Sequence, residues 1–265
     1  MCRLAGYRGP SVPLATLIYD PPHGLEHQSY KPREMISGSV SVDGTGIVWW
    51  VEGDSTPLRY VSERPPWSDA NLPRLASRLG GCQQLAAVRS ATPGTAFGPR
   101  AVLPFTHTGV AGALNGYLGR FREQTGPALV ARLPAKLFAA LDSGSDASVA
   151  FLTVMRHREQ GSAEDSGDSL RRALREAVAE IFAVCSEAGA PASLTMLLAE
   201  ADRILAVRAA SGAPPNSLYV AQDAQRWPSA LLIASEPLDD DTAWQAVPAD
   251  HLVETSRMGW HMEPL

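Results

Sequence analysis

The sequence has 265 residues, of which 45% are hydrophobic, and it carries a formal net charge of −5. This length and apolar content suffice to bury a substantial core. The acidic balance excludes a global basic field, so neither a nucleic acid nor an anionic membrane surface is an expected partner. No apolar run is long enough to span a bilayer, and the first residues lack the zones of a signal peptide.

The cysteines and histidines indicate neither a disulfide framework nor a metal site. Cys2, Cys82 and Cys185 are widely spaced and form no CxxC pair. An odd, scattered set argues against both disulfide scaffolding and a cysteine zinc site. The histidines show no ligand spacing, and the adjacent aspartates 239–241 lack the glycine spacing of a calcium loop. We therefore expect a protein of the reducing cytoplasm that uses no metal and no other cofactor.

The first third of the chain predicts strands and loops. Residues 3–9 predict a short strand that ends at Pro10, and the stretch from Pro21 to Arg33 predicts an extended loop. Residues 38–51 alternate around Asp43-Gly44, a turn signal with β-prone residues on both sides. This pattern predicts a hairpin.

Further strands are expected towards the middle of the chain. On the second strand of the predicted hairpin, one ring of Trp49-Trp50 is expected in the core and the other near the surface. Residues 84–89 predict a buried strand. Residues 110–114 predict another, which Asn115-Gly116 closes as a turn.

After these strands, the spacing of apolar residues changes to that expected of helices. Leucines at positions 129, 133, 137 and 141 recur every fourth residue, as one face of a helix requires. The polar segment 159–167 predicts a loop. Asp168 is the expected cap of a second helix, with Gly189 as its stop. The apolar stripe of that helix is Leu170, Leu174, Val178, Ile181 and Cys185.

The last part of the chain is again strand-like. Strands are predicted at Ser193–Ala199, Arg203–Ala209, Leu218–Gln222 and Ala230–Ser235. The order of strands, helices and strands, without regular βαβ alternation, favours an α+β layered fold. No internal repeat and no linker is evident, so we expect one domain over residues 1–265.

Cys2 is a candidate nucleophile because it follows the initiator methionine. Methionine is removed efficiently when the next side chain is small, and removal of Met1 would leave a thiol and a free α-amine on one residue. That amine has an ordinary pKa of about 8, so it can take the thiol proton when neutral. The alternative is a Met-Cys start without significance, and a retained Met1 would block the amine.

Three further positions could serve an amide substrate, and each has a plainer interpretation. Arg89, at the end of a predicted strand, could clamp a carboxylate or only end the strand in solvent. Asn115-Gly116 could direct N–H groups at an oxyanion or form an ordinary turn. Asp146, just before a predicted helix, could accept hydrogen bonds from a substrate amine or act as an N-cap.

Taken in order, these motifs resemble those of class II glutamine amidotransferases, the N-terminal-nucleophile hydrolases that begin with cysteine. The motifs are Met1-Cys2-Arg3, Arg89-Ser90-Ala91-Thr92, Asn115-Gly116 and Ser145-Asp146. The resemblance implies a four-layer αββα sandwich in which Cys2 attacks a γ-glutamyl amide. It implies that Arg89 holds the substrate α-carboxylate, with Thr92 also in the substrate site, and that Asp146 holds the α-ammonium. It assigns the oxyanion hole to Asn115 and Gly116.

Longer segments resemble the γ-glutamyl-hercynylcysteine sulfoxide hydrolase family of the ergothioneine pathway. They are residues 1–7, 20–25, 28–30, 86–94 and 234–241, together with Trp244. This resemblance implies a stand-alone hydrolase that releases glutamate from γ-glutamyl-hercynylcysteine sulfoxide with water. It implies no cofactor, and a small γ-glutamyl molecule as the partner.

The chain departs from this family at three places that we expect around the pocket. Leu114 stands where the family usually has histidine, and Thr45 stands between two glycines where an aromatic residue is common. Ala147-Ser148 follows Asp146 in place of Ser-Glu. The rival functions are hydrolysis of glutamine or another γ-glutamyl amide, and non-catalytic binding of a γ-glutamyl ligand. The sequence leaves the leaving amine and the oligomeric state open.

Overall fold

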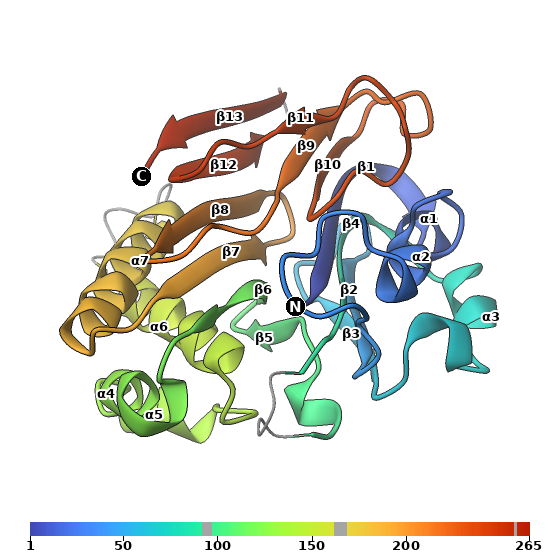
Figure 1. Ribbon diagram of the computed structural model, residues 1–265. Helices are drawn as coiled ribbons and strands as arrows, with labels where there is room; N and C mark the ends of the chain where they lie inside the picture. Colours follow the sequence, from blue (N-terminus) through green and yellow to red (C-terminus); the bar gives the residue numbers. More distant parts are fainter. Residues whose placement is uncertain (92–96, 162–168, 257–258) are drawn as a thin grey trace.

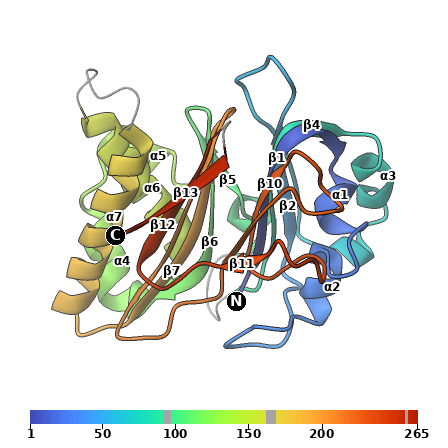
Figure 2. The ribbon, with the colours of Figure 1, turned by 90° about the horizontal axis from the view of Figure 1, so that it is seen from above.

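The computed structural model describes residues 1–91, 97–161, 169–256 and 259–265. Within these ranges, two β-sheets face each other and helices cover the outer side of each sheet (Figure 1). Figure 2 shows the four layers edge-on, with α6 and α7 on one outer side and α1, α2 and α3 on the other. The expected α+β class and αββα sandwich are confirmed.

The first sheet contains seven described strands in the order β11-β9-β10-β1-β4-β2-β3, and its neighbouring strands are antiparallel. In chain order these strands are β1 (Arg3–Pro13), β2 (Thr45–Trp50), β3 (Leu58–Ser62), β4 (Gly80–Val88), β9 (Tyr219–Gln222), β10 (Leu231–Ala234) and β11 (Gln245–Ala246). Arg3 of β1 lies opposite Val88 of β4. The start of β1 is therefore next to the end of β4.

The second sheet contains six described strands in the order β13-β12-β8-β7-β6-β5, again with antiparallel neighbours. In chain order these strands are β5 (Phe105–His107), β6 (Val110–Leu118), β7 (Ala192–Ala199), β8 (Ile204–Ser211), β12 (His251–Ser256) and β13 (Gly259–Pro264). β5 pairs with β6 only at residues 110–112. Beyond residue 112, one edge of β6 is left uncovered by the described strands.

Helices complete the two outer layers. Their bounds are α1 (Ala15–Ile18), α2 (Leu25–Tyr30), α3 (Leu72–Ala76), α4 (Gly126–Val130), α5 (Ala135–Ala139), α6 (Asp146–Gln160) and α7 (Ser169–Glu187). Shorter turns are 3₁₀-helical at Pro66–Ser68 and Pro99–Ala101 and π-helical at Phe121–Thr125. No helix in the described part of the chain combines the length and apolar character needed to cross a membrane.

The central strands are buried on both faces. In β2, Ile47 and Trp49 pack under the helices of the first sheet, whereas Val48 and Trp50 pack between the sheets. Strands covered on both sides read as continuous apolar runs rather than as alternating ones. The expectation of one tryptophan near the surface was wrong, because Trp49 is 6% exposed and Trp50 is fully buried.

Two further expectations for the first third of the chain were wrong. β1 continues past Pro10 to Pro13, because its pairing with β4 is interrupted between Arg8 and Val12 and a proline fits such an irregularity. The loop expected between Pro21 and Arg33 contains α2, whose inner side chains are buried against the first sheet.

The hairpin expected around Asp43-Gly44 does not form. Residues 38–44 form no strand, and β2 pairs with β3 and β4 instead. The Asp43 N–H donates to the Arg89 carbonyl at 2.9 Å, and the Arg89 N–H donates to the Gly44 carbonyl at 2.8 Å. Asp43 and Gly44, just before β2, are thus joined to the main chain of Arg89 by two hydrogen bonds.

The turn expected at Asn115-Gly116 was also wrong. β6 runs through both residues to Leu118, with Asn115 opposite Thr195 and Gly116 opposite Leu194. Pairing with β7 outweighs the local turn preference of the dipeptide, since strand preference depends on context. The four strands expected after Pro191 are confirmed, with ends that differ by one or two residues.

Among the helices, the prediction for α7 is confirmed. Its five stripe residues are buried, and Gly189 has φ +59°, as a helix stop requires. The expected cap Asp168 lies outside the described residues. The helix expected around leucines 129–141 is split into α4 and α5, because Pro134 lacks an N–H and adopts an extended conformation. α6 reaches Gln160, into the expected loop, and residues 162–167 of that loop lie outside the described ranges.

Candidate active site

Four residues singled out in the sequence meet at one end of the sandwich. Cys2 precedes β1, Arg89 follows the neighbouring strand β4, Gly116 lies on β6, and Asp146 begins α6. All four line one small recess of about 30 Å³. Cys2, Gly116 and Asp146 also line a larger adjoining cleft of about 660 Å³. Thr92 lies outside the described residues.

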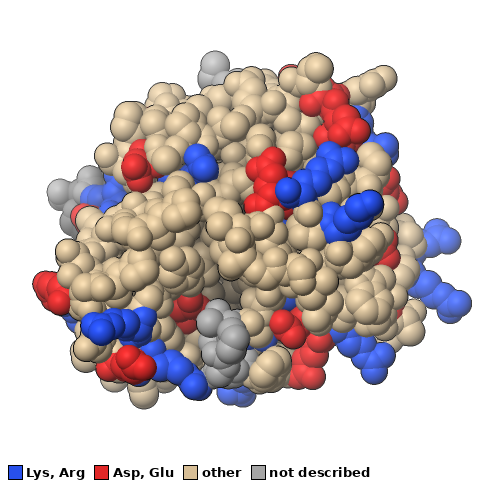
Figure 3. Space-filling view, viewed as in Figure 1, with Lys and Arg blue, Asp and Glu red and all other residues tan. Residues whose placement is uncertain are grey.

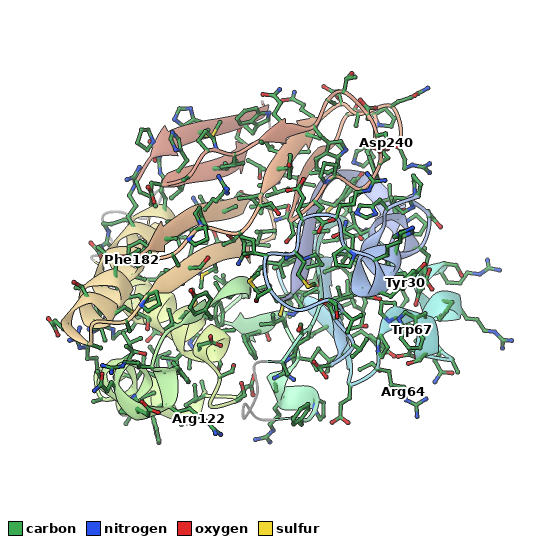
Figure 4. All side chains as sticks on the ribbon, in the orientation of Figure 1. Tyr30, Arg64, Trp67, Arg122, Phe182 and Asp240 are labelled. Atoms are coloured by element: carbon green, nitrogen blue, oxygen red, sulfur yellow. The ribbon has the colours of Figure 1, made fainter. Side chains whose placement is uncertain are left out.

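Part of the cleft lining comes from the end of β6 and the segment that follows it. Residues 117–123 line the cleft, including Arg122, which is labelled in Figure 4. Met1 and Ser37 also line it. Acidic and basic side chains are interspersed among the described residues on the face shown in Figure 3, in keeping with the small net charge.

The Cys2 thiol is almost completely enclosed. Its side chain is 9% exposed, and Sγ lies 3.8 Å from the Ser90 carbonyl oxygen, to which the thiol donates. Burial raises the pKa of this thiol above its ordinary value, although the Ser90 contact and the nearby Arg89 charge act in the opposite direction. The thiol is therefore protonated at neutral pH and needs a base to become a nucleophile.

Met1 covers the position at which that base would act. Its ammonium donates to the Ser37 carbonyl at 3.3 Å, and its carbonyl accepts from Ser41 Oγ at 3.0 Å. Burial lowers the pKa of this amine. In a chain that keeps Met1, the nitrogen of Cys2 is an amide nitrogen and has no basicity.

The Cys2 carbonyl is held by two side chains. Arg3 Nε donates to it at 2.7 Å. Because a guanidinium only donates, the amide of Asn115 is assigned with its oxygen facing Arg3 Nη2 at 3.2 Å, so that its nitrogen donates to the Cys2 carbonyl at 2.9 Å. Asn115 and Arg3 are both fully buried. The structure therefore brings Asn115 into contact with Cys2, the candidate nucleophile.

The N–H of Gly116 is directed at the open edge of β6. The Leu118 N–H leaves the strand on the side away from β7, since it donates to Asp146 Oδ2 at 3.3 Å. N–H groups two residues apart in a strand point to the same side. The Gly116 N–H thus points towards the cleft, where it is available to a ligand oxygen.

Arg89 and Asp146 place opposite charges beside Cys2. Arg89 is 5% exposed, and its guanidinium lies 5.9 Å from the centre of the Phe97 ring. Asp146 accepts from the Ala147 N–H at 2.9 Å as well as from Leu118. Burial raises the pKa of Asp146, whereas these hydrogen bonds and the Arg89 charge oppose that rise. Such a pair suits a ligand that carries both a carboxylate and an ammonium.

The plain N-cap interpretation of Asp146 was wrong. Ser145 is the cap of α6, and its Oγ accepts from the Ser148 N–H at 3.2 Å. Asp146 is thereby the first helical residue, with its side chain free to face the cleft.

Of the residues that depart from the family pattern, Leu114 and Ala147 line the recess. Thr45 Oγ1 donates to the Arg64 carbonyl at 2.8 Å, away from Cys2. Ser148 is buried in the first turn of α6 and lines neither the recess nor the cleft. The expectation that Leu114, Thr45 and Ser148 all surround the pocket was wrong for Thr45 and Ser148. Thr45 is hydrogen-bonded to Arg64 instead, and Ser148 is buried in the first turn of α6.

The sequence did not reveal the role of Glu236. This fully buried carboxylate accepts from Arg3 Nη1 and lies 2.8 Å from His23 Nε2. Arg3 and Glu236 are 233 positions apart, so no local pattern could have paired them. Within the described residues, no cluster of three or more His, Cys, Asp or Glu side chains is arranged to hold a metal ion.

We expect Gly116→Ala to damage both the fold and the site. An added Cβ would lie 1.9 Å from the Ser193 carbonyl oxygen, so β6 and β7 would have to separate. The expected loss in the free energy of unfolding is about 1–3 kcal/mol, measured by urea titration. Gly144→Ala is the control, because its Cβ meets nothing within 4 Å. Equal stabilities of the two variants would contradict this prediction.

Comparison with known proteins places this chain in a family. No protein-family model matches the chain. A γ-glutamyl-hercynylcysteine sulfoxide hydrolase of Mycobacterium tuberculosis is 31% identical over 259 residues, which cover 98% of this chain and 94% of the relative. The protein of the same name from Mycolicibacterium smegmatis is 32% identical over 255 residues, or 96% and 95% of the two chains. The chain belongs to the γ-glutamyl-hercynylcysteine sulfoxide hydrolase family.

Solved structures show that this hydrolase family shares its fold with glutamine amidotransferases. A glutamine aminotransferase class-II domain protein from Silicibacter pomeroyi has a TM-score of 0.72 at 20% identity, covering 99% of this chain and 98% of the other. Glutamine phosphoribosylpyrophosphate amidotransferase from B. subtilis has a TM-score of 0.67 at 14% identity. The match covers 99% of this chain and 49% of the B. subtilis chain.

Proposed function

We propose that this chain hydrolyses the γ-glutamyl amide bond of γ-glutamyl-hercynylcysteine sulfoxide. The products are glutamate and hercynylcysteine sulfoxide, within ergothioneine biosynthesis. The observation that carries the proposal is the recess that joins the Cys2 thiol to Arg89, Gly116 and Asp146. The opposite charges of Arg89 and Asp146 match the α-carboxylate and α-ammonium of a glutamyl group, and the names of the sequence relatives suggest the identity of the leaving amine.

Binding of the glutamyl group uses the two charged side chains. Arg89 pairs with the substrate α-carboxylate, and Asp146 pairs with the α-ammonium. These contacts place the γ-carbonyl carbon beside Cys2 Sγ, which converts attack into an intramolecular step. The leaving amine extends into the larger cleft, along residues 117–123.

The reaction begins once Met1 has been removed. The Cys2 α-amine takes the thiol proton, and Sγ forms a bond to the γ-carbonyl carbon. The Asn115 amide and the Gly116 N–H stabilise the resulting oxyanion. When the C–N bond breaks, the ammonium returns its proton to the leaving amine, which leaves a γ-glutamyl thioester.

Water completes the cycle. The neutral α-amine removes a proton from water as its oxygen attacks the thioester carbon. Collapse of the second tetrahedral intermediate breaks the C–S bond and releases glutamate, and the α-ammonium returns the proton to Sγ, which restores the Cys2 thiol and the neutral amine. The leaving amine therefore ends as a free product, and no ammonia needs to be transferred to another site.

The test is release of glutamate by the Met1-processed protein. With γ-glutamyl-hercynylcysteine sulfoxide, kcat/KM should exceed that for glutamine or γ-glutamylcysteine by at least about tenfold. Cys2→Ala should lower the rate at least about 10⁴-fold. Equally slow release by wild type and Cys2→Ala would show the proposal to be wrong. Equal rates on all three amides would favour a general γ-glutamyl amidase.

We also propose that the reaction takes place in the cytoplasm. The three cysteines are free thiols, which suits this reducing compartment.

We further propose that residues 1–265 act as one domain, since one apolar core cluster includes side chains from both sheets.

A further inference from the structure

Arg3 is a buried cation with three partners around the nucleophile. Its side chain is fully buried, and Nε donates to the Cys2 carbonyl at 2.7 Å. Nη1 donates to Glu236 Oε1 at 2.8 Å, and Nη2 lies 3.2 Å from the amide oxygen of Asn115. One guanidinium therefore contacts the residue of the nucleophile, the residue of the oxyanion hole and a buried carboxylate.

The contact with Asn115 determines which way its amide faces. A guanidinium has five N–H donors and no acceptor, so only the oxygen of an amide can face it favourably. The Asn115 oxygen is thus held on the Arg3 side, and the amide nitrogen donates to the Cys2 carbonyl. In the proposed reaction the second N–H of this nitrogen serves the oxyanion of the substrate. An amide rotated by half a turn would present its oxygen to the Cys2 carbonyl and would offer the substrate no N–H donor.

Glu236 holds Arg3 in this position. Besides Arg3, it accepts from the main-chain N–H groups of Arg33 and Glu34, at 2.8 and 3.0 Å. His23 Nε2 lies 2.8 Å from its second oxygen. A carboxylate with this many donors is anchored, and it keeps the guanidinium from turning away from Asn115.

We propose that Arg3, held by Glu236, is a positioning residue that keeps the amide nitrogen of Asn115 on the side of the developing oxyanion. This inference rests on the proposed function, in which Cys2 is the nucleophile and Asn115 a donor of the oxyanion hole. It adds a buried ion pair that lines neither the recess nor the cleft and acts on kcat through Asn115.

The test separates positioning from simple structural support. In the double variant Arg3→Met/Glu236→Gln the buried site is uncharged, so no lone charge is left to unfold the chain. The introduced glutamine amide retains one acceptor oxygen for the main-chain N–H groups of Arg33 and Glu34, which now bond the two separate carboxylate oxygens. We expect kcat to fall roughly ten- to hundredfold, less than for loss of an oxyanion donor itself, with KM changed less than about threefold. Alkylation of Cys2 by iodoacetamide, which forms no oxyanion, should stay within about twofold of wild type.

Two single variants at Arg3 test the same role without relying on the double variant to fold. Lysine only donates, so Arg3→Lys should retain more of kcat than Arg3→Gln, whose amide can also accept and so permits Asn115 to rotate. The control is Arg203→Met/Glu254→Gln, an ion pair of 3.2 Å that does not line the cleft. Its kcat should equal that of wild type.

The possible results distinguish failure of the proposed function from failure of the positioning role of Arg3. A wild type that releases no glutamate, or releases it equally without Cys2, overturns the proposed function and the inference together. Release that depends on Cys2, with kcat unchanged in the folded double variant, overturns the inference alone. Equal kcat values for Arg3→Lys and Arg3→Gln also overturn it.

Discussion

A chain that retains Met1 should release glutamate at least about 10⁴-fold more slowly than the processed chain, as expected when a nucleophile has lost its base. The Met1 amine is held against the Ser37 carbonyl, one residue away from the thiol it would have to deprotonate. The Cys2 thiol has a pKa raised by burial, so it supplies little thiolate without help. Met1 also lines the cleft that the leaving amine would enter.

The experiment compares one preparation before and after processing. Protein produced while methionine excision is inhibited is assayed, treated with purified methionine aminopeptidase and assayed again, with intact mass confirming each state. Cys2→Ala, treated in the same way, is the control and should remain inactive after processing. A retained-Met1 chain as active as the processed chain would rule out the α-amine as the base.

Glu236→Ala should be the most destabilising single substitution in this region, with a loss of roughly 3–5 kcal/mol in the free energy of unfolding. The substitution leaves the fully buried Arg3 guanidinium without its carboxylate and removes the acceptor of two main-chain N–H groups. Urea titration of the purified variant measures the loss. Glu254→Ala is the comparison, since its ion pairs with Arg171 and Arg203 are partly exposed and should contribute less than about 1 kcal/mol. Equal losses would contradict the prediction.

The same carboxylate should make the protein sensitive to acid. Hydrogen bonds from His23 and from the main chain, with the Arg3 charge, outweigh burial and lower the pKa of Glu236 to about 2. A carboxyl whose pKa is lower in the folded state stabilises the fold above its unfolded pKa and loses that contribution as the pH falls. From pH 6 to pH 2, wild type should therefore lose about 3 kcal/mol more than Glu236→Gln. Parallel pH dependences of the two proteins would contradict the assignment.

How much of the site could be predicted from sequence depended on whether the signal was local. Cys2, Arg89, Gly116 and Asp146 lie in short motifs and line one recess, and Asn115 contacts the Cys2 carbonyl, whereas the roles of these residues stay a prediction. The backbone conformation of these residues was harder to predict from the sequence. Asn115-Gly116 has the composition of a turn, yet β6 continues through it because β7 supplies its hydrogen-bond partners.

The sequence by itself determined the features that depend on neighbouring residues. The stripe of α7, the apolar strands after Pro191 and the small residue after Met1 were visible as local patterns. Only the tertiary structure decided that Glu236 meets Arg3, that β2 pairs with β3 and β4, and that Asp43-Gly44 fastens Arg89. A buried ion pair or a strand pairing depends on which distant segments pack against each other and exclude water. Such contacts produce no periodic pattern of residues in the sequence. The candidate nucleophile Cys2 could thus be proposed from the sequence, whereas the contacts that hold it arise from the packing of two distant parts of the chain.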